Sequence, residues 1–218
     1  MTPELLERFH PRAMRWMTLV VDRTPITQTL DIDDSAVTLL LEPIRFQKKN
    51  DEFDQYLPED YMYWVLIARK HIFGSASETP ISKRTPEDSA ALSLQITDCW
   101  DSSIRSILHL QDKVQSSLLN VLSADPDMEA WASSDKITCI GDAIHVMSPS
   151  GGVGAVTALM DGANLAKIIS TKGISIESIG EFEKNMREYA GANIRRSYFG
   201  GRKLFGQRPF EQCSKYEG

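Results

Sequence analysis

The first half of the chain alternates apolar runs with polar or charged segments. Residues 36–46 and 61–69 are crowded with β-branched, aromatic and leucine side chains, which is typical of strands. Because proline cannot donate a ladder hydrogen bond, Pro43 is expected to break the first run or to place it at a sheet edge. Residues 14–21 are apolar and fit either a helix or a strand. The pattern predicts an antiparallel sheet in the β-rich part, residues 36–69.

The rest of the chain shows mainly helical spacing. The segment TPED at 85–88 combines an N-cap residue, a proline and acidic residues, and two helices are expected across residues 86–111. The segment TPE at 2–4 carries the same signature for a short helix. Residues 116–122 fit a strand that returns to the sheet. Residues 176–200 predict a long helix whose one face carries Ile179, Phe182, Met186, Tyr189 and Ala190.

A strand–loop–helix pattern occupies residues 136–166. An apolar run, Ile137–Ile140, ends in Gly141-Asp142, and a loop rich in proline and glycine follows. A helix of small residues then begins, with Asp161 inside it. Proteins use this layout to bring backbone N–H groups against an anionic or polar ligand. This segment is therefore the main candidate for a binding site.

Length, charge and cysteine content narrow the class of protein. The chain has 218 residues and a formal net charge of −6, so a basic surface for nucleic acid or anionic membranes is not expected. The apolar runs are too short to span a bilayer and the N-terminus lacks an apolar signal core, which predicts a cytoplasmic protein. The cysteines match neither disulfide nor metal-ligand spacing, so no metal site is expected, and Cys139 is predicted to be a small core residue.

The loop residues suit a flat ligand that carries or develops negative charge. An ionised Asp142 at the end of a strand accepts hydrogen bonds from sugar or polyol hydroxyls. Pro149 stiffens the loop, and Gly152 and Gly154 lack a Cβ, so a ligand can approach their backbone closely. The N–H groups of residues 153–155 would face the ligand at a helix N-terminus, where partial positive charge stabilises negative charge. This chemistry fits the edge of a flavin ring that becomes anionic on reduction; a packing role alone is the other interpretation.

The full string of residues resembles the single-component FAD-dependent monooxygenases related to para-hydroxybenzoate hydroxylase, especially those of fungal secondary metabolism. Their second flavin motif runs G-D-A-x-H-x-x-x-P-x-x-G-x-G-x-N and is followed by a D-A-x-x-L-A helix. The matching positions are Gly141, Asp142, Ala143, His145, Pro149, Gly152, Gly154 and Asp161. Residues 64–69, 100–112 and 187–197 are also similar to the substrate-side half of that family, so the resemblance covers most of the chain beyond about residue 35.

The resemblance implies roles for individual residues. Asp142 would bind the ribityl or pyrophosphate-linked part of FAD, and residues 152–155 would border the isoalloxazine ring, above which Pro149 shapes the space. His145 would be structural rather than a catalytic base, and Asp161 would order its helix rather than touch the ligand. No residue is singled out as catalytic. The implied cofactor-binding set is Gly141, Asp142, Pro149, Gly152, Val153, Gly154 and Ala155. The candidates for a substrate pocket roofed by the sheet are Arg45, Tyr61, Tyr63 and Trp64.

Parts of the family pattern are missing. The family begins with a βαβ unit that carries G-x-G-x-x-G, and this chain contains no such motif and no mid-chain Asp-Gly motif apart from the flavin helix. Val156 and Gly162 stand where the motif has Asn and Ala. The chain thus resembles a C-terminal half, with a weak or partial FAD site that lacks the adenosine-binding part, and with NAD(P)H as co-substrate if active. The expected partners are a small hydrophobic or aromatic metabolite and either a nucleotide-binding N-terminal half or a second copy of the chain.

The expected fold is α/β with α+β character. Residues 1–130 would form a substrate-binding domain with an antiparallel sheet and helices. Residues 131–218 would form the C-terminal part of an FAD-binding domain that lacks its N-terminal βαβ unit. The predicted function is NAD(P)H- and O₂-dependent hydroxylation or epoxidation of an aromatic or polyketide-type metabolite, by a truncated or half-protein form. The alternatives are a flavin-independent descendant that acts as a cyclase, isomerase or metabolite-binding protein, and a non-catalytic interaction protein.

Overall fold

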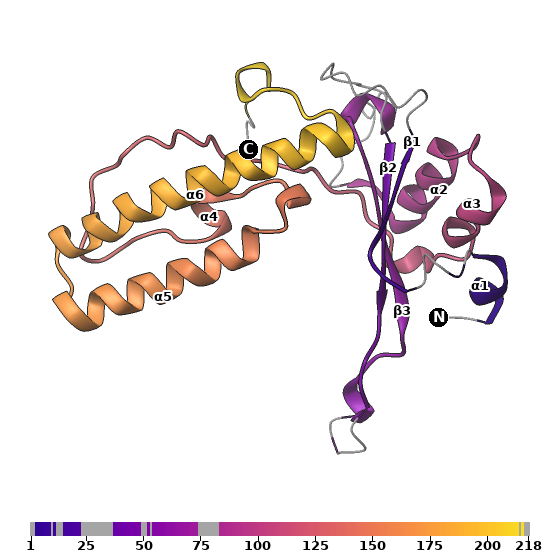
Figure 1. Cartoon of the computed structure of the whole chain (residues 1–218), viewed down its shortest axis with the longest axis horizontal. Helices are drawn as coiled ribbons and strands as arrows, with labels where there is room; N and C mark the ends of the chain where they lie inside the picture. The colour runs from indigo at the N-terminus through magenta and orange to yellow at the C-terminus, as the bar shows by residue number, and fades with distance from the viewer. Residues whose placement is uncertain are drawn as a thin grey trace. The chain divides into compact units, whose positions relative to one another are not determined.

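The computed structural model describes residues 3–9, 11, 15–22, 37–48, 52, 54–73, 83–213 and 215. The chain divides into two compact units, Met1–Leu119 and Asn120–Gly218 (Figure 1). The division falls between residues 119 and 120, whereas the sequence placed a domain boundary at residue 130. Each unit is described by itself below.

A three-stranded antiparallel sheet forms the centre of the first unit. The strands lie in the order β1 (Thr18–Asp22), β2 (Val37–Ile44) and β3 (Tyr61–Ala68). Both strands predicted from the β-rich runs are confirmed, and the apolar run that fitted a helix or a strand contributes β1. β2 is the central strand because it pairs with both neighbours.

Pro43 does not break β2. It lies opposite Met62 of β3, beyond Leu41, where the pairing between β1 and β2 ends. On the β1 side of Pro43 the ladder therefore has no partner that would need a backbone donor. The edge interpretation of Pro43 holds locally, although β2 as a whole is the central strand.

Helices pack against one face of this sheet (Figure 1). They are α1 (Pro3–Arg8), α2 (Pro86–Ile96) and α3 (Ser102–His109), which confirms the helices predicted from the TPE and TPED segments. At the start of α2, the Thr85 hydroxyl accepts a hydrogen bond from the Asp88 N–H at 3.1 Å, and the Asp88 carboxylate accepts one from the Thr85 N–H. The buried core consists of Leu5, Phe9, Leu39, Leu41, Ile107 and Leu108.

Residues 116–122 do not form the predicted strand. The segment has no regular secondary structure, and the side chains of Leu119 and Val121 are 77% and 50% exposed. A strand is stabilised by a hydrogen-bonded neighbour and one buried face. This segment buries too little of its apolar surface for that, so the prediction was wrong.

Two long helices dominate the second unit, α5 (Gly154–Lys172) and α6 (Ile176–Phe205). They follow one another with a short connection and lie side by side (Figure 1). The single helical turn α4 (Asp142–His145) precedes them. The helix of small residues and the long terminal helix predicted from the sequence are both confirmed.

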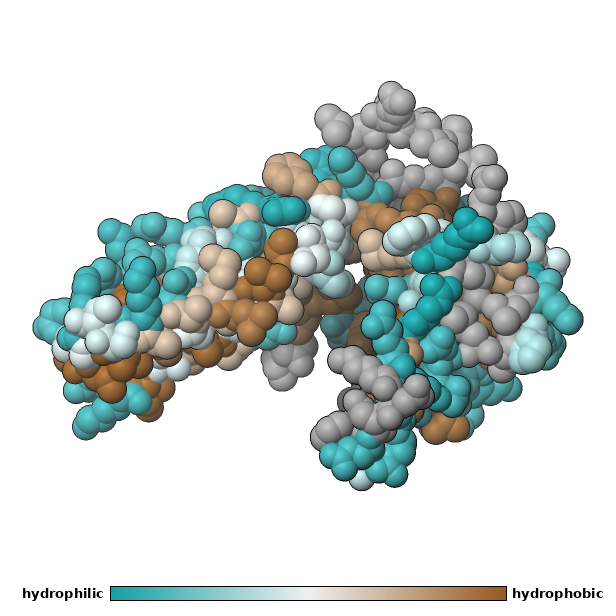
Figure 2. All heavy atoms as spheres, turned by 60° about the horizontal axis from the view of Figure 1, so that its bottom comes forward, coloured by the Kyte–Doolittle hydropathy of each residue, from teal (hydrophilic) through white to brown (hydrophobic). Residues whose placement is uncertain are grey.

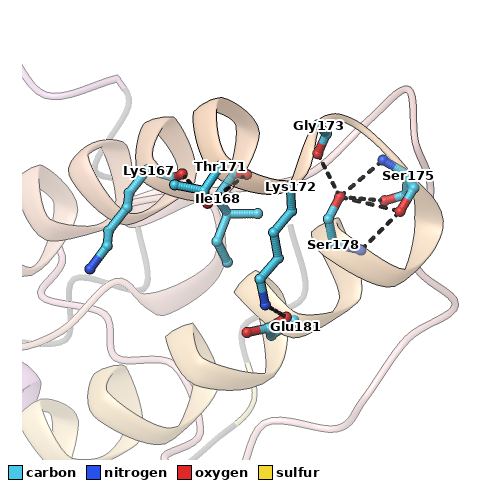
Figure 3. Close-up of polar contacts among 8 residues, drawn as sticks. All are labelled: Lys167, Ile168, Thr171, Lys172, Gly173, Ser175, Ser178 and Glu181. Atoms are coloured by element: carbon cyan, nitrogen blue, oxygen red, sulfur yellow. Dashed lines mark hydrogen bonds and ion pairs between the residues drawn. The ribbon is translucent and has the colours of Figure 1, made fainter.

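A tight, polar connection fixes the α5–α6 pair (Figure 3). Gly173 has φ +74°, a conformation that favours glycine, and it ends α5. The hydroxyls of Ser175 and Ser178 form a capping box at the start of α6, and Ser178 Oγ also donates to the Gly173 carbonyl at 2.8 Å. Lys172 forms an ion pair with Glu181 across the two helices at 2.5 Å. These bonds occupy backbone groups that both helix ends would otherwise leave unpaired.

The predicted apolar face of α6 is the buried one. Ile179, Phe182, Met186 and Ala190 are at most 4% exposed. One charged residue, Glu183, is buried with them. Its carboxylate accepts hydrogen bonds from Ser133 Oγ at 2.6 Å and from Thr138 Oγ1 at 2.9 Å, so the buried charge has polar partners. An irregular segment, residues 120–140, lies against α6 through these bonds.

The predicted strand at Ile137–Ile140 is also not formed. No backbone–backbone hydrogen bond is found for these residues within the described part of the chain, and Ile137 is 76% exposed. Cys139, predicted to be a core residue, is exposed. A strand in a parallel sheet requires at least one hydrogen-bonded neighbouring strand, and the described residues supply none. The β-prone sequence is therefore present without its sheet.

No helix in the described ranges combines the length and the apolar character that a membrane span requires.

Candidate cofactor-binding site

The loop between Gly141 and α5 begins with an unusual backbone turn. Gly141 is buried and has φ +63° and ψ −146°, a region that is essentially restricted to glycine. A Cβ at this position would lie 3.4 Å from the Cβ of Ala158. Asp142 follows as the first residue of α4 and is exposed. Its carboxylate therefore projects from a helical turn and not, as predicted, from the end of a strand.

One buried carboxylate holds this turn in place. Asp161, which lies seven residues after the first residue of α5, is fully buried. Its Oδ2 accepts a hydrogen bond from the Gly141 N–H at 2.7 Å and lies 2.6 Å from His145 Nε2. Its Oδ1 accepts a hydrogen bond from the Tyr189 hydroxyl of α6. Asp161 thus joins three separate elements of the second unit.

His145 takes part in this network through one ring nitrogen only. The imidazole is completely buried, and Nδ1 has no hydrogen-bond partner within the described residues. Since Nε2 faces a carboxylate, the tautomer that fits the geometry carries its hydrogen on Nε2. Leaving Nδ1 buried and unpaired costs about 1–3 kcal/mol. A buried, oriented imidazole of this kind fits the structural role that the family resemblance implied.

Tyr189 is the member of the network that sequence reasoning missed. It was placed only on the apolar face of α6, although its phenol is the one polar group in that set. Burial raises the pKa of the Tyr189 phenol well above its usual value, and the hydrogen bond to Asp161 adds to the rise. The hydroxyl therefore stays protonated and donates to Asp161 at every ordinary pH.

The loop after α4 is pressed against α6. Ser148 caps a 3-10 turn at Pro149–Gly151 by accepting a hydrogen bond from the Ser150 N–H, and Gly152 follows with φ +62°. A Cβ on Gly151 would lie 2.4 Å from Ser197 Oγ of α6. The same Cβ would lie 2.9 Å from the backbone Cα of Ser197, so a side chain at position 151 would force the loop or α6 to shift.

The start of α5 presents backbone donors that have no acceptor among the described residues. Its N-cap residue, Val153, makes no side-chain cap, and the first i→i−4 hydrogen bond of the helix runs from Thr157 N to the Val153 carbonyl at 2.9 Å. The N–H groups of Gly154, Ala155 and Val156 precede that bond and have no intrahelical acceptor. Ala155 and Val156 are exposed. Donors and helix dipole together suit an anionic or electron-rich ligand edge.

The candidate substrate-pocket residues do not share one surface. Trp64 is partly buried and packs against the core on the helix-covered face of the sheet. Tyr61 and Tyr63, at alternate positions of β3, point to the opposite face, and they are 44% and 48% exposed. Arg45 follows the end of β2 and is exposed. Only the two tyrosines therefore stand together, on the face opposite the helices, and the pocket itself stays a prediction.

Comparisons with known proteins find similarity to FAD-binding proteins, the class that the loop motif predicted. Residues 109–172 match the family described as FAD binding domain. The dual O-methyltransferase/FAD-dependent monooxygenase elcB of Phaeosphaeria nodorum is 42% identical over 249 residues, which cover 100% of this chain and 26% of that protein. The protein of the same description, CTB3 of Cercospora beticola, is 44% identical over 223 residues, which cover 99% of this chain and 26% of the relative.

A solved structure shows the fold. The crystal structure of a Photorhabdus luminescens protein assigned as an FAD-containing monooxygenase superimposes with a TM-score of 0.66 at 22% identity, and the match covers 94% of this chain and 52% of that one. This chain therefore shares the fold of about half of that structure. The predicted resemblance to the FAD-dependent monooxygenases is confirmed, and this chain spans about a quarter of the length of the curated relatives it matches.

Proposed function

We propose that this chain supplies the flavin-ring side of an FAD site in a monooxygenase that uses NAD(P)H and O₂ to hydroxylate or epoxidise an aromatic or polyketide-type metabolite. The observation that carries the proposal is the uncapped N-terminus of α5, whose free N–H groups follow the left-handed Gly152 within the family's flavin motif. FAD, when bound, supplies the redox chemistry. The residues of the chain hold and orient it.

The free donors of α5 fit one half of the cofactor. The N–H groups of Gly154, Ala155 and Val156 would bind the ring edge that gains negative charge on reduction, and the helix dipole would stabilise that charge. Asp142, exposed beside the same loop, would accept hydrogen bonds from ribityl hydroxyls. The sequence holds no glycine-rich motif for the adenosine and pyrophosphate. The residues present therefore fit the flavin half of FAD and not its nucleotide half.

We also propose that a nucleotide-binding half covers an exposed apolar stripe on α5. Val156, Leu159 and Met160 recur on one side of the helix at 57%, 74% and 42% exposure. Figure 2 shows apolar side chains gathered on the surface of this unit. Apolar patches of this kind are typical of protein contact sites. The chain covers 52% of the solved structure that shares its fold, which supports a further segment of that fold, rather than a second copy of this chain, as the occupant.

The proposal can be tested with three ligands. Because the chain lacks the adenosine-binding part, FAD and FMN should bind it with similar affinity, and ADP should compete with neither. Three lost charge-assisted hydrogen bonds, at about 1.5–3 kcal/mol each, would make binding of FAD at least about a thousandfold weaker than in a complete relative. Flavin fluorescence quenching measures all three ligands.

Two matched variants sharpen this test. Asp142→Asn should weaken FMN binding, whereas Asp135→Asn, which removes another exposed carboxylate of the same segment, should not. Competition by ADP would contradict the assignment to the flavin half. Absence of binding by either flavin, even with a nucleotide-binding half of a relative added in excess, would reject the proposed function and favour the flavin-independent alternative.

A further inference from the structure

We infer that Asp161 is a positioning residue that sets the Gly141–Asp142 turn relative to the N-terminus of α5, with Tyr189 as its second anchor. The inference rests on the proposed function, because those are the two parts of the loop that would contact the flavin. It differs from a helix-ordering role for Asp161, which would concern α5 alone.

The first step is the reach of the carboxylate. Asp161 bonds to residues 20, 16 and 28 positions away in the sequence: the Gly141 backbone, the His145 ring and the Tyr189 hydroxyl. These groups belong to the turn before α4, to α4 and to α6. The two oxygens of the carboxylate bind different elements. Oδ2 bonds to the turn and to α4, and Oδ1 bonds to α6.

The second step is the shared helix. Gly154, the first residue of α5, lies seven residues before Asp161, which corresponds to about 10 Å or two turns of helix. A helix of this length is stiff. The Gly141 N–H is bonded to the same helix whose first N–H groups would face the ring edge. The positions of Asp142 and of the N–H donors of α5 are therefore both fixed relative to α5, and Asp161 makes the connection.

The third step is that the turn needs a hydrogen bond to hold it in one conformation. The backbone of Gly141 lies in a region open essentially to glycine alone, and glycine has many other conformations of similar energy. The hydrogen bond from its N–H to Asp161 selects one of them. Packing alone would be served as well by an apolar residue at position 161, whereas a buried carboxylate must be fully hydrogen-bonded to be tolerated.

The chain offers a close internal control. Glu183 of α6 is also a fully buried carboxylate with hydrogen bonds from neighbouring groups, Ser133 and Thr138. It touches neither the Gly141 turn nor the start of α5. For the phenol, Tyr198 of α6 provides the match, because no hydrogen bond of its hydroxyl is found among the described residues.

The test compares Asp161→Asn and Tyr189→Phe with Glu183→Gln and Tyr198→Phe in the whole chain. Amide hydrogen exchange is measured by NMR at Gly141 and at residues 154–156, and FMN affinity is measured by fluorescence. Loss of one hydrogen bond to Asp161 should raise the amide exchange rate of Gly141 about tenfold, which corresponds to a change of about 1.4 kcal/mol in the free energy of local opening. FMN binding should weaken by a comparable factor. Tyr198→Phe should leave both quantities within about twofold of wild type, as expected for a site without shared partners. Glu183→Gln should lower the stability of the second unit but leave FMN affinity within about twofold of wild type.

A purely structural role for Asp161 predicts a different result. Asp161→Asn and Glu183→Gln would then lower the thermal midpoint alike, with no selective exchange at Gly141 and no selective loss of FMN, and that outcome would overturn the inference. If Asp161→Asn fails to fold, Tyr189→Phe decides in the same way, since it removes one hydroxyl and keeps the ring. If wild-type chain binds no flavin, the proposed function fails, whereas the exchange comparison still decides whether Asp161 holds the turn.

Discussion

Substitution of Gly200 by alanine provides a sharp test of the packing around the flavin loop. Gly200 lies within α6, and a Cβ there would be 2.6 Å from the carbonyl oxygen of Ser150 and 3.0 Å from its carbonyl carbon. Alanine in place of glycine favours a helix by about 1 kcal/mol. Overpacking against backbone atoms costs about 1–3 kcal/mol, because backbone cannot rotate away as a side chain can. The overlap should offset the gain in helix propensity or exceed it, with a net loss of up to about 2 kcal/mol.

The same substitution at Gly162 should have the opposite sign. Gly162 is an exposed position inside α5, and a Cβ there would meet nothing within 4 Å. Gly162→Ala should therefore stabilise the chain by up to about 1 kcal/mol through helix propensity alone. The pair changes one methyl group in two helices, so it separates the clash from the intrinsic preference for alanine.

Urea denaturation followed by far-ultraviolet circular dichroism measures both effects. α5 and α6, with 19 and 30 residues, are the longest helices and dominate the signal. With a mid-range slope of about 2 kcal/mol per molar urea, Gly200→Ala should lower the midpoint by up to roughly 1 M. A Gly200→Ala variant that is stabilised as much as Gly162→Ala would refute the close contact between α6 and the turn at Ser150.

Three further predictions concern single interactions. Thr85→Ala removes the capping box of α2 and should cost about 0.5–2 kcal/mol by urea denaturation, while Thr85→Ser should restore most of it. Glu183→Gln should destabilise the second unit by about 1–3 kcal/mol, because it weakens the hydrogen bonds to Ser133 and Thr138. Faster proteolysis of the segment around these two residues would show that the segment is released. Unchanged cleavage would contradict the role of these bonds. Since the pKa of Tyr189 is higher in the folded state than in the unfolded one, its contribution to stability is complete below about pH 10 and is lost as the pH rises further. Wild type should therefore lose stability more steeply than Tyr189→Phe between pH 9 and pH 11 in urea titrations, and parallel curves would contradict this.

Local patterns were sufficient for most elements of the fold. β2 and β3 followed from β-branched and aromatic runs, and α2 from a cap whose reciprocal hydrogen bonds are now seen. The predicted strands at 116–122 and Ile137–Ile140 failed for a common reason. Strand propensity reports how well a side chain fits a sheet, but the sheet has to exist, and neither segment finds a paired neighbour in the described structure.

The candidate site was predictable in its residues and not in its connections. The motif pointed to Asp142, the loop glycines and the start of α5. Nothing local to Asp161 indicates that it bonds a glycine 20 residues before it and a tyrosine 28 residues after it. Likewise, the need for glycine at Gly200 arises from a loop 50 positions away in the sequence, which no periodicity within α6 could reveal. Contacts between distant segments require the fold.

The bare backbone of Ile137–Ile140 has a consequence for the behaviour of the protein in concentrated solution. The four residues are uncharged and rich in β-branched side chains, and their backbone groups are unpaired within the described chain. Such a segment is a template on which another chain can add as a strand. Lys136 and Asp142 flank it and act as charged gatekeepers against that addition. Aggregation of the isolated chain is therefore expected to start here, and a strand that docks on this segment would suppress it by pairing with the exposed backbone.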